Sequence, residues 1–167
     1  LFGLYGVNTP KGGFLNDLES KNNLDFPMIV KPNCGGSSNR LYKIDDFEQL
    51  RKFEKEKHPN EFIYEEFIEG REITVGILNN ELCGIMEIIF DSDLYDYNKK
   101  YISVAKHIIN PELPTDIIKM LNENSVLIHN KFNCNCISRL DFRYDENNEK
   151  LFLLEINTQP GLTKHSL

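Results

Sequence analysis

The sequence predicts an α+β fold in which most of the sheet is antiparallel. Segments with strand character outnumber segments with helical character, and several strands follow one another across short turns, as they do in hairpins. The chain has 167 residues, of which 40% are hydrophobic, enough for an ordinary core in one domain or two small ones. We therefore expect a globular α+β protein.

The first predicted strand and the loop after it lie in the first quarter of the chain. The segment "FPMIVKP" at 26–32 is a short apolar run bounded by prolines, a pattern typical of a buried strand, and Lys31 lies near its end. It is followed by "NCGGSSNR" at 33–40, a series of small residues that predicts a loop. A cation therefore stands between a buried strand and a glycine-serine loop.

Two segments have helical periodicity. The first, at 45–57, begins with Asp45 and Glu48, which fit a capping box. The second, at 114–132, starts near Thr115 or Asp116. The residues expected to face inward are Phe47, Leu50 and Phe53 in the first helix, and Ile117, Ile118, Leu121, Ile128 and Phe132 in the second.

The remaining strands are predicted from runs of β-branched and aromatic residues. Residues 61–90 read as strands joined at Gly70 and at the Asn79–Asn80 turn, and residues 136–157 as two strands around the turn "DENNE". The segment between them that begins "DSDLYDYNKKYIS", at 91–103, is polar, aromatic and irregular. Hairpins thus dominate the second half of the chain.

Charge and composition exclude several functional classes. The net charge of −7 and the pI near 5.1 argue against a general nucleic-acid binder, which needs clustered Lys and Arg. No run approaches about 18 consecutive apolar residues, so no membrane-spanning helix is expected, and the start of the chain has no secretion-signal pattern. The four cysteines lack zinc-site spacing, and we expect reduced thiols in a cytoplasmic protein.

The last predicted hairpin carries a group of polar side chains. Side chains alternate along a strand, so a hairpin centred near Asn147 or Asn148 turns the odd-numbered residues of both strands to one face. The even-numbered residues Leu140, Phe142, Leu154 and Ile156 then belong to the core. The residues expected to share the polar face are Arg139, Asp141, Glu155 and Asn157.

This polar face has the chemistry of a magnesium site. Two carboxylates and an amide oxygen are hard ligands that suit Mg²⁺, which usually completes its shell with water and phosphate oxygens. Arg139 fits such a site if a bound anion gains negative charge during a reaction. The alternative is a solvated hairpin face with a single Arg–carboxylate pair.

The glycine-serine loop adds a candidate phosphate site. Its backbone amides can cradle phosphate oxygens, with Lys31 as a point charge beside them, although a plain turn is the alternative for the loop alone. The Lys precedes the glycines, so this is not a Walker A loop. Taken with the acidic hairpin, the loop predicts a nucleotide–metal site. The loop residues are Gly35, Gly36, Ser37 and Ser38.

The ordered motifs of the chain resemble those of the ATP-grasp enzymes and, within them, of the D-alanine–D-alanine ligase family. The motifs are "PMIVKPNCGGSS", "YEEFIEGREITVGIL", "YDYNKKY", "RLDF" and "LLEINTQPGLTKHSL". The resemblance runs from about Gly6 to Leu167. It implies that ATP is sandwiched between two α+β subdomains with mainly antiparallel sheets, 1–67 with the phosphate loop and 68–167 with the metal and acceptor sites.

The resemblance also implies the roles of individual residues. For the nucleotide, it implies phosphate contacts from Lys31, Lys100, Gly35, Gly36 and Ser38, main-chain contacts of Glu65 and Ile68 with adenine, and contacts of Glu72 with the ribose hydroxyls. For the metal, it implies two Mg²⁺ ions, with Mn²⁺ as a possible substitute, on Asp141, Glu155 and Asn157. For the substrates, it implies Ser37 and Tyr101 as a positioning hydroxyl pair, Arg139 and Gly161 as oxyanion donors, and Ser166 and Leu167 at the second amino acid.

The reaction implied is the joining of two D-alanines for peptidoglycan precursor synthesis. The carboxylate of the first D-alanine attacks the γ-phosphate of ATP to give an acyl phosphate, and the amine of the second then displaces phosphate. Another acceptor, such as D-lactate, is an alternative, and Tyr101 weighs mildly against D-lactate because phenylalanine often stands there in such enzymes. A non-catalytic nucleotide-binding module is the alternative from a different class.

Three departures from the family pattern are expected to matter. The family's N-terminal domain, which supplies a Glu for the first D-alanine, and its C-terminal helices are not part of this sequence, so we expect a fragment that binds Mg-ATP weakly and ligates poorly. Arg40 stands where the loop pattern has Gly, and a positive φ there would be strained. The full-length protein is a possible homodimer.

Overall fold

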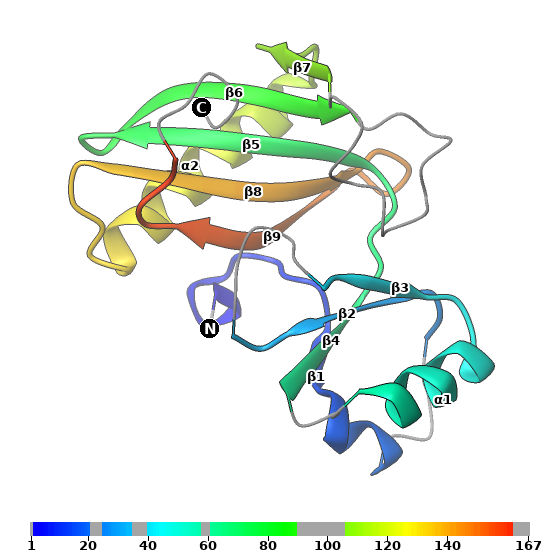
Figure 1. Cartoon of the computed structure of the whole chain (residues 1–167). Coiled ribbons are helices and arrows are strands. Elements are labelled where there is room, and N and C mark those ends of the chain that lie inside the picture. Colours follow the sequence, from blue (N-terminus) through cyan, green and yellow to red (C-terminus); the bar gives the residue numbers. More distant parts are fainter. Residues whose placement is uncertain (1, 21–24, 35–39, 58–60, 90–105, 162–167) are drawn as a thin grey trace. The chain divides into compact units, whose positions relative to one another are not determined.

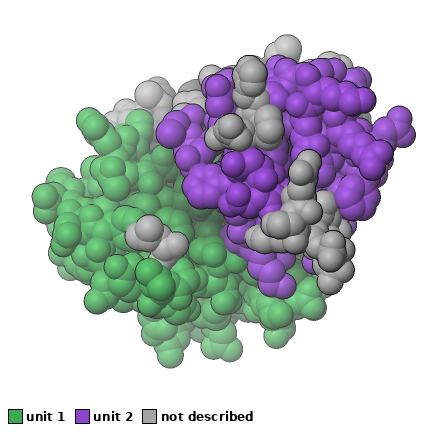
Figure 2. Space-filling model, turned by 90° about the horizontal axis from the view of Figure 1, so that it is seen from below, with its two compact units in different colours: residues 1–9, 68–93, 102–167 green, residues 10–67, 94–101 purple. Residues whose placement is uncertain are grey.

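A computed structural model describes residues 2–20, 25–34, 40–57, 61–89 and 106–161 of the chain, and these residues fall into two compact units. Figure 2 colours the two units, which are described separately here. The division falls between Phe67 and Ile68, but residues 2–9 group with the C-terminal part. The described residues are 2–9, 68–89 and 106–161 in unit 1, and 10–20, 25–34, 40–57 and 61–67 in unit 2.

Unit 2 contains a four-stranded antiparallel sheet with the order β1-β4-β2-β3 (Figure 1). Its elements are β1 (Gly12–Phe14), η2 (Leu15–Ser20), β2 (Met28–Pro32), β3 (Tyr42–Ile44), α1 (Phe47–Glu56) and β4 (Phe62–Glu66). The predicted buried strand is confirmed as β2, in which Met28 and Val30 are buried. Because side chains alternate along a strand, Lys31 points to the opposite face of this sheet.

The predicted first helix is confirmed as α1, but its cap lies one residue later than expected. The N-cap is Asp46, whose side chain accepts a hydrogen bond from the Gln49 amide at 2.9 Å. Gln49 Oε1 in turn accepts from the amide of Asp45 at 3.2 Å. The prediction that Asp45 and Glu48 form the capping box was therefore wrong. Phe47, expected to face inward, is 57% exposed at the start of the helix, and its ring packs edge-on against Phe26.

Unit 1 contains a five-stranded antiparallel sheet with the order β7-β6-β5-β8-β9, and helix α2 lies across one face of it (Figure 1). Its elements are η1 (Phe2–Tyr5), β5 (Arg71–Leu78), β6 (Glu81–Ile89), β7 (Lys106–Ile109), α2 (Thr115–Lys131), β8 (Ile137–Asp145) and β9 (Lys150–Asn157). The α+β class with antiparallel sheets is thus confirmed. No helix among the described residues is both long enough and apolar enough to span a membrane.

The second helix begins where the sequence predicts and buries most of the expected residues. Ile117, Leu121 and Ile128 are buried in the unit 1 core, and Phe132 is partly buried against it. Ile118 was expected to face inward but is 38% exposed. Position 118 lies about 100° around the helix from 117, so both cannot face the sheet equally. The described cap residue, Pro114, makes no side-chain cap hydrogen bond.

Two hairpins of unit 1 follow the predicted turns. Asn79 and Asn80 connect β5 to β6 with φ angles of 50° and 67°, the left-handed pair that a two-residue type I′ hairpin requires. The second hairpin joins β8 to β9. Its strands pair in antiparallel register, with Arg139 opposite Asn157 and Asp141 opposite Glu155. The predicted centre of this hairpin is therefore confirmed.

A bulge in the β8–β9 hairpin changes one part of the core prediction. The register shifts between Asp141 and Phe142, so Phe142 lies opposite Leu153. Leu153 is consequently 1% exposed, whereas Leu154, which was expected in the core, is only half-buried. One extra residue in a strand reverses the facing of every residue beyond it. Ile156 packs against the core as expected.

Candidate functional site

The four polar residues predicted for the last hairpin lie together on one face of the unit 1 sheet. We call them the β8–β9 cluster: Arg139 and Asp141 on β8, and Glu155 and Asn157 on β9. They lie before the bulge on β8 and after it on β9, where the two strands stay in register. They form two directly opposite cross-strand pairs. Opposite residues in an antiparallel pair have side chains within contact distance. The predicted convergence of these four side chains is confirmed.

The carboxylate of Asp141 is the centre of this cluster. Arg139 donates to both of its oxygens, from Nε to Oδ1 at 3.0 Å and from Nη2 to Oδ2 at 2.9 Å. Thr74 on β5 donates its hydroxyl to Oδ1 at 2.6 Å, and Asn157 donates Nδ2 to Oδ2 at 3.1 Å. Charge-assisted and bidentate hydrogen bonds are the strong ones. Asp141 is therefore held in one orientation from three sides.

Asn157 connects the two carboxylates of the cluster. Its Nδ2 donates to Asp141 Oδ2 and to Glu155 Oε1, each at 3.1 Å. Oxygens from both acids thus lie within hydrogen-bonding distance of one point in space. A half-turn of the Asn157 amide would exchange this nitrogen for the amide oxygen. Two anionic oxygens around one point make a place for positive charge.

Arg139 carries the positive charge of the cluster. Burial lowers the pKa of its guanidinium, but hydrogen bonding to Asp141 and the charges of Asp141, Glu155 and Glu72 outweigh that effect and raise the pKa above its usual value. The side chain is 24% exposed. Arg139 therefore carries its positive charge at neutral pH, beside the two acids of the cluster.

A second ion pair lies beside the cluster on the same face of the sheet. Glu72 on β5 lies opposite Arg143 on β8, and Arg143 Nη2 is 3.1 Å from Glu72 Oε2. Arg143 Nη1 also donates to the carbonyl oxygen of Gly70 at 2.9 Å. The predicted ribose ligand Glu72 is thus paired with a cation.

Two predicted nucleotide residues, Lys31 and Glu65, lie on the non-core face of the unit 2 sheet, and a third, Ile68, is the first residue of unit 1 after β4. Lys31 Nζ forms an ion pair with Glu65 Oε2 at 2.6 Å, and both side chains are partly exposed. Glu65 lies within β4, opposite Ile29 on one side and Gly12 on the other. Ile68 follows β4, outside any strand. Lys31 and the β8–β9 cluster belong to different units, so their expected closeness stays a prediction.

The remaining predicted site residues lie beyond the end of β9 or outside the described residues. Gly161 is described and is exposed, after the end of β9. The others lie outside the described residues, and their roles stay predictions: Gly35, Gly36, Ser37, Ser38, Lys100, Tyr101, Ser166 and Leu167.

Sequence reasoning missed two residues of this face, Thr74 and Arg143. Thr74 is 4% exposed and lies opposite Asp141 across the β5–β8 pair. The signal was present in part, because Arg143 continues the spacing of Arg139 and Asp141 along one strand. Recognising Thr74 requires the register between β5 and β8, which are separated by β6, β7 and α2 in the chain.

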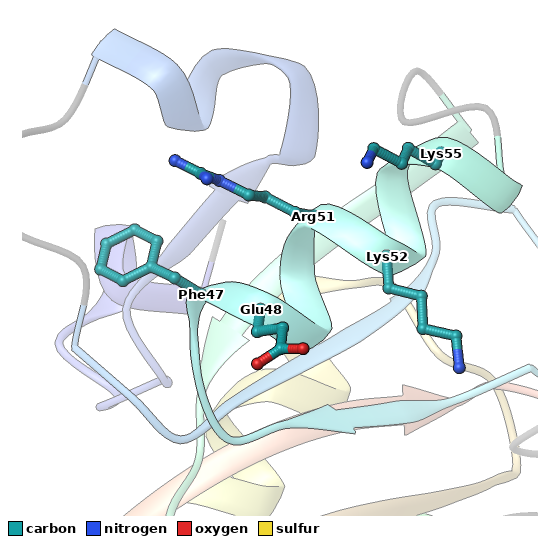
Figure 3. A pocket seen from close by; sticks show the side chains of 5 residues that line it. All are labelled: Phe47, Glu48, Arg51, Lys52 and Lys55. Atoms are coloured by element: carbon teal, nitrogen blue, oxygen red, sulfur yellow. The ribbon is translucent and has the colours of Figure 1, made fainter.

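A pocket on unit 2 contains none of the predicted site residues. Figure 3 shows its lining side chains, all of which come from α1. Three are basic and one is acidic, and the ring of Phe47 is exposed. Because these side chains project from a single helix, they do not converge as the β8–β9 cluster does. The lining residues are Phe47, Glu48, Arg51, Lys52 and Lys55.

The donor set of the β8–β9 cluster fits a magnesium ion. Among the described residues, no three His, Cys, Asp or Glu side chains are grouped so that they could hold a metal ion. The cluster offers two carboxylates, and the amide of Asn157 supplies a third oxygen if it turns over. Mg²⁺ is usually held by one or two carboxylates together with water and phosphate oxygens. The small number of acids is therefore compatible with this metal.

Comparison with known proteins gives a consistent result. A family model described as "D-ala D-ala ligase C-terminus" matches residues 11–167. The chain is 42% identical over 147 residues to D-alanine--D-alanine ligase of Pelagibacter ubique, covering 87% of this chain and 48% of that protein. The chain therefore spans about half the length of the curated relatives it matches.

Solved structures agree with this assignment. The VanG D-Ala:D-Ser ligase of Enterococcus faecalis is 30% identical with a TM-score of 0.78, covering 99% of this chain and 52% of that one. A D-alanine--D-alanine ligase of Bacillus anthracis, solved with ATP, is 25% identical with a TM-score of 0.75, covering 99% of this chain and 55% of that one. The chain has the ATP-grasp fold and belongs to the D-alanine–D-alanine ligase family, whose C-terminal part it matches.

Proposed function

We propose that the intact protein joins two D-alanine molecules at the expense of ATP, as a step in peptidoglycan precursor synthesis. Family membership supports the reaction class. The observation that carries the proposal is local: Asp141 and Glu155 converge on the amide of Asn157, beside a charged Arg139. Carboxylates and an arginine in contact on one sheet face suit a reaction in which phosphoryl charge must be neutralised.

The residues that would hold two Mg²⁺ ions are Asp141, Glu155 and Asn157. Mn²⁺ could take the place of Mg²⁺ there. When bound, the metal would offset the negative charge of the transferring phosphoryl group. Thr74 would fix the Asp141 carboxylate, because ligating carboxylates are themselves hydrogen-bonded in metal sites. Turning of the Asn157 amide would present its oxygen to the cation.

The nucleotide would be held by residues of both units. Lys31 and Lys100, with the amides of Gly35, Gly36 and Ser38, would contact phosphate oxygens. Lys31 would exchange its ion pair with Glu65 for a phosphate contact, a small loss because a partly exposed ion pair contributes only about 0.2–1 kcal/mol. The main chain of Glu65 and Ile68 would contact adenine, and Glu72 the ribose.

The reaction would proceed in two displacements. A carboxylate oxygen of the first D-alanine attacks the γ-phosphorus, and ADP leaves. The amine nitrogen of the second D-alanine then attacks the acyl carbon, loses a proton, and phosphate leaves as the peptide bond forms. Arg139 and the Gly161 amide would stabilise the tetrahedral oxyanion, which preorganised donors do well. Ser37 and Tyr101 would position substrate, and Ser166 and Leu167 would meet the second carboxylate.

The test is phosphate release by the intact protein with Mg-ATP and a panel of D-alanine, D-serine and D-lactate as acceptors. We expect release that requires Mg²⁺ and D-alanine and yields D-Ala-D-Ala by mass spectrometry. A Lys31→Met variant should raise the KM for ATP about 10-fold or more, as loss of a hydrogen bond to a charged group does. No release with any acceptor, despite nucleotide binding, would support the non-catalytic alternative.

A different acceptor is the second candidate for the same chemistry. The similarity to a D-Ala:D-Ser ligase, at 30% identity, is the observation that favours testing D-serine. Preferential formation of D-Ala-D-Ser in the acceptor panel would replace the D-alanine assignment and leave the reaction type unchanged. A cytoplasmic location and a homodimeric state of the intact protein stay predictions of the family resemblance.

A further inference from the structure

Among the described residues, Arg143 contacts Glu72 near the start of strand β5 and Gly70 just before that strand. Its Nη2 contacts Glu72 Oε2 at 3.1 Å, and its Nη1 donates to the Gly70 carbonyl at 2.9 Å. The guanidinium is planar and rigid, so two partners engaged at once fix its plane. Its side chain is 23% exposed and that of Glu72 is 20% exposed. Arg143 therefore ties the carboxylate of Glu72 to the backbone two residues before it.

The backbone at Gly70 is held at the same place. Its φ of 142° is one that glycine tolerates and other residues rarely adopt. A Cβ at this position would collide with the carbonyl oxygen of Tyr144, the residue after Arg143. The main chain just before β5 is thus close to that of β8, and Arg143 donates a hydrogen bond to the Gly70 carbonyl at the same residue. The position of Glu72 is set by main chain and side chain together.

The remaining hydrogen-bonding capacity of Glu72 is what a ligand would meet. A carboxylate offers about four lone-pair sites on two oxygens, and the contact with Arg143 is made by one of these oxygens, Oε2. Glu72 lies on the same sheet face as Asp141 and Glu155. If ATP binds there, these three carboxylates face the negative charge of its phosphates. Arg143 offsets one of those negative charges through its ion pair with Glu72.

We propose that Arg143 is a positioning residue that sets specificity for the ribose of the nucleotide, by holding Glu72 to accept from the 2′- and 3′-hydroxyls. The inference rests on the proposed function for the assignment of Glu72 to the ribose. It adds to that assignment a residue which the motifs do not contain. The expected consequence is selective: Arg143 matters for a nucleotide that carries a 2′-hydroxyl and less for one that lacks it.

The experiment compares ATP with 2′-deoxy-ATP in the intact protein, by D-alanine-dependent phosphate release. Arg143→Ala should raise the KM for ATP about 3- to 10-fold, the scale of one partly exposed charged contact, and change kcat less than about twofold. The KM for 2′-deoxy-ATP should change much less. Arg143→Lys keeps the charge without the two-pronged geometry and should fall between the wild type and Arg143→Ala.

Two further variants separate positioning from general damage. In a Glu72→Gln background, Arg143→Ala should add little, because its partner is already altered. Arg71→Ala is the matched control. Arg71 is 21% exposed and donates two hydrogen bonds, of 2.8 and 2.7 Å, to Glu87. It precedes Glu72 on β5, so its side chain points to the other face of the sheet. The Arg71→Ala change should lower the Tm without changing the ratio of the two KM values.

Equal KM changes for ATP and 2′-deoxy-ATP in Arg143→Ala and Arg143→Lys would overturn the inference, as would additive effects with Glu72→Gln. Failure of the proposed function gives a different result, since the wild type would then release no phosphate with D-alanine. In that event, the dissociation constants of the two nucleotides, measured by calorimetry, apply the same criterion to Arg143. A matched loss of affinity for both would again contradict it.

Discussion

The charged groups of the two units are held in different ways. In unit 1, Asp141 accepts hydrogen bonds from Arg139, Thr74 and Asn157, which come from three adjacent strands. In the described part of unit 2, Lys31 forms an ion pair with Glu65. A carboxylate fixed by several donors is preorganised, whereas a lysine on a flexible stem adapts to its partner. Unit 1 therefore presents a rigid site, and unit 2 an adjustable cation.

The largest effect is expected when the central carboxylate of the rigid site is removed. Asp141→Asn eliminates a proposed metal ligand and the anionic partner of Arg139, so kcat/KM for phosphate release should fall about 10²- to 10³-fold. The matched control is Asp145→Asn, also on β8, where the carboxylate caps the following turn through Asn147 and Asn148. An equal loss in both variants would assign the effect to stability.

Thr74→Val tests whether the rigidity itself matters. Valine keeps the shape of Thr74 but removes the hydroxyl that donates to Asp141 at 2.6 Å. We expect the Mg²⁺ concentration for half-maximal turnover to rise about 10-fold, as it does when other hydrogen-bonding partners of metal ligands are removed. Mn²⁺ affinity, measured by electron paramagnetic resonance, should weaken in parallel. Thr74→Ser restores the hydroxyl and should restore metal binding. Unchanged Mn²⁺ affinity in Thr74→Val would show that Asp141 needs no such support.

The sequence predicted the rigid site better than the adjustable one, for a physical reason. Hairpin alternation alone is enough to place Arg139, Asp141, Glu155 and Asn157 together, because their strands are neighbours in the chain. The ion pair of Lys31 with Glu65 depends on the pairing of β2 with β4, which are separated in the chain by β3 and α1. The bulge that exchanged Leu154 for Leu153 in the core also leaves no local signal.

Short edge elements were missed for a similar reason. Strands β1, β3 and β7 have three or four residues each, too few to show an alternating pattern. Their pairing with longer neighbours makes them strands. The capping error at α1 has the opposite origin: Asp45 and Asp46 are adjacent, and either offers a suitable side chain. Only the observed bond of Asp46 with the Gln49 amide selects between them.

Arg40→Gly probes the backbone of unit 2. Arg40 has a φ of 60°, the left-handed region that costs a residue with a Cβ about 1 kcal/mol. Glycine should therefore raise the unfolding free energy in urea by roughly that amount. Arg40→Ala keeps the Cβ and should give no gain, which separates backbone strain from loss of the arginine charge. A stabilisation shared by both variants would point to charge.

The smallest expected effect lies in the core behind the rigid site. His129 on α2 is 1% exposed and its Nδ1 lies 2.7 Å from Ser138 Oγ on β8. Burial lowers the pKa of His129, so below about pH 6.5 the unfolded chain binds a proton that the folded chain does not. This contribution to stability is complete above pH 6.5 and is lost as the pH falls toward the lowered pKa.

Urea unfolding at pH 7.5 and pH 5.5 measures this effect when the wild type is compared with His129→Gln, which has no titrating group. The wild type should lose more stability on acidification than the variant. A pH-independent difference between the two proteins would show that His129 does not titrate differently on folding. Effects of other acids and histidines cancel in this comparison as long as they are common to both proteins.

The central claim is that Asp141, Glu155 and Asn157 hold the cation that carries the nucleotide phosphates. Anomalous diffraction from crystals of the intact protein with Mn²⁺ and a non-hydrolysable ATP analogue tests it most directly. The account predicts Mn²⁺ peaks within coordination distance, about 2.1 Å, of oxygens of these three side chains, with Lys31 turned from Glu65 to a phosphate. Nucleotide bound with no Mn²⁺ peak at these oxygens, and with the Asn157 amide nitrogen still between the two acids, would contradict it.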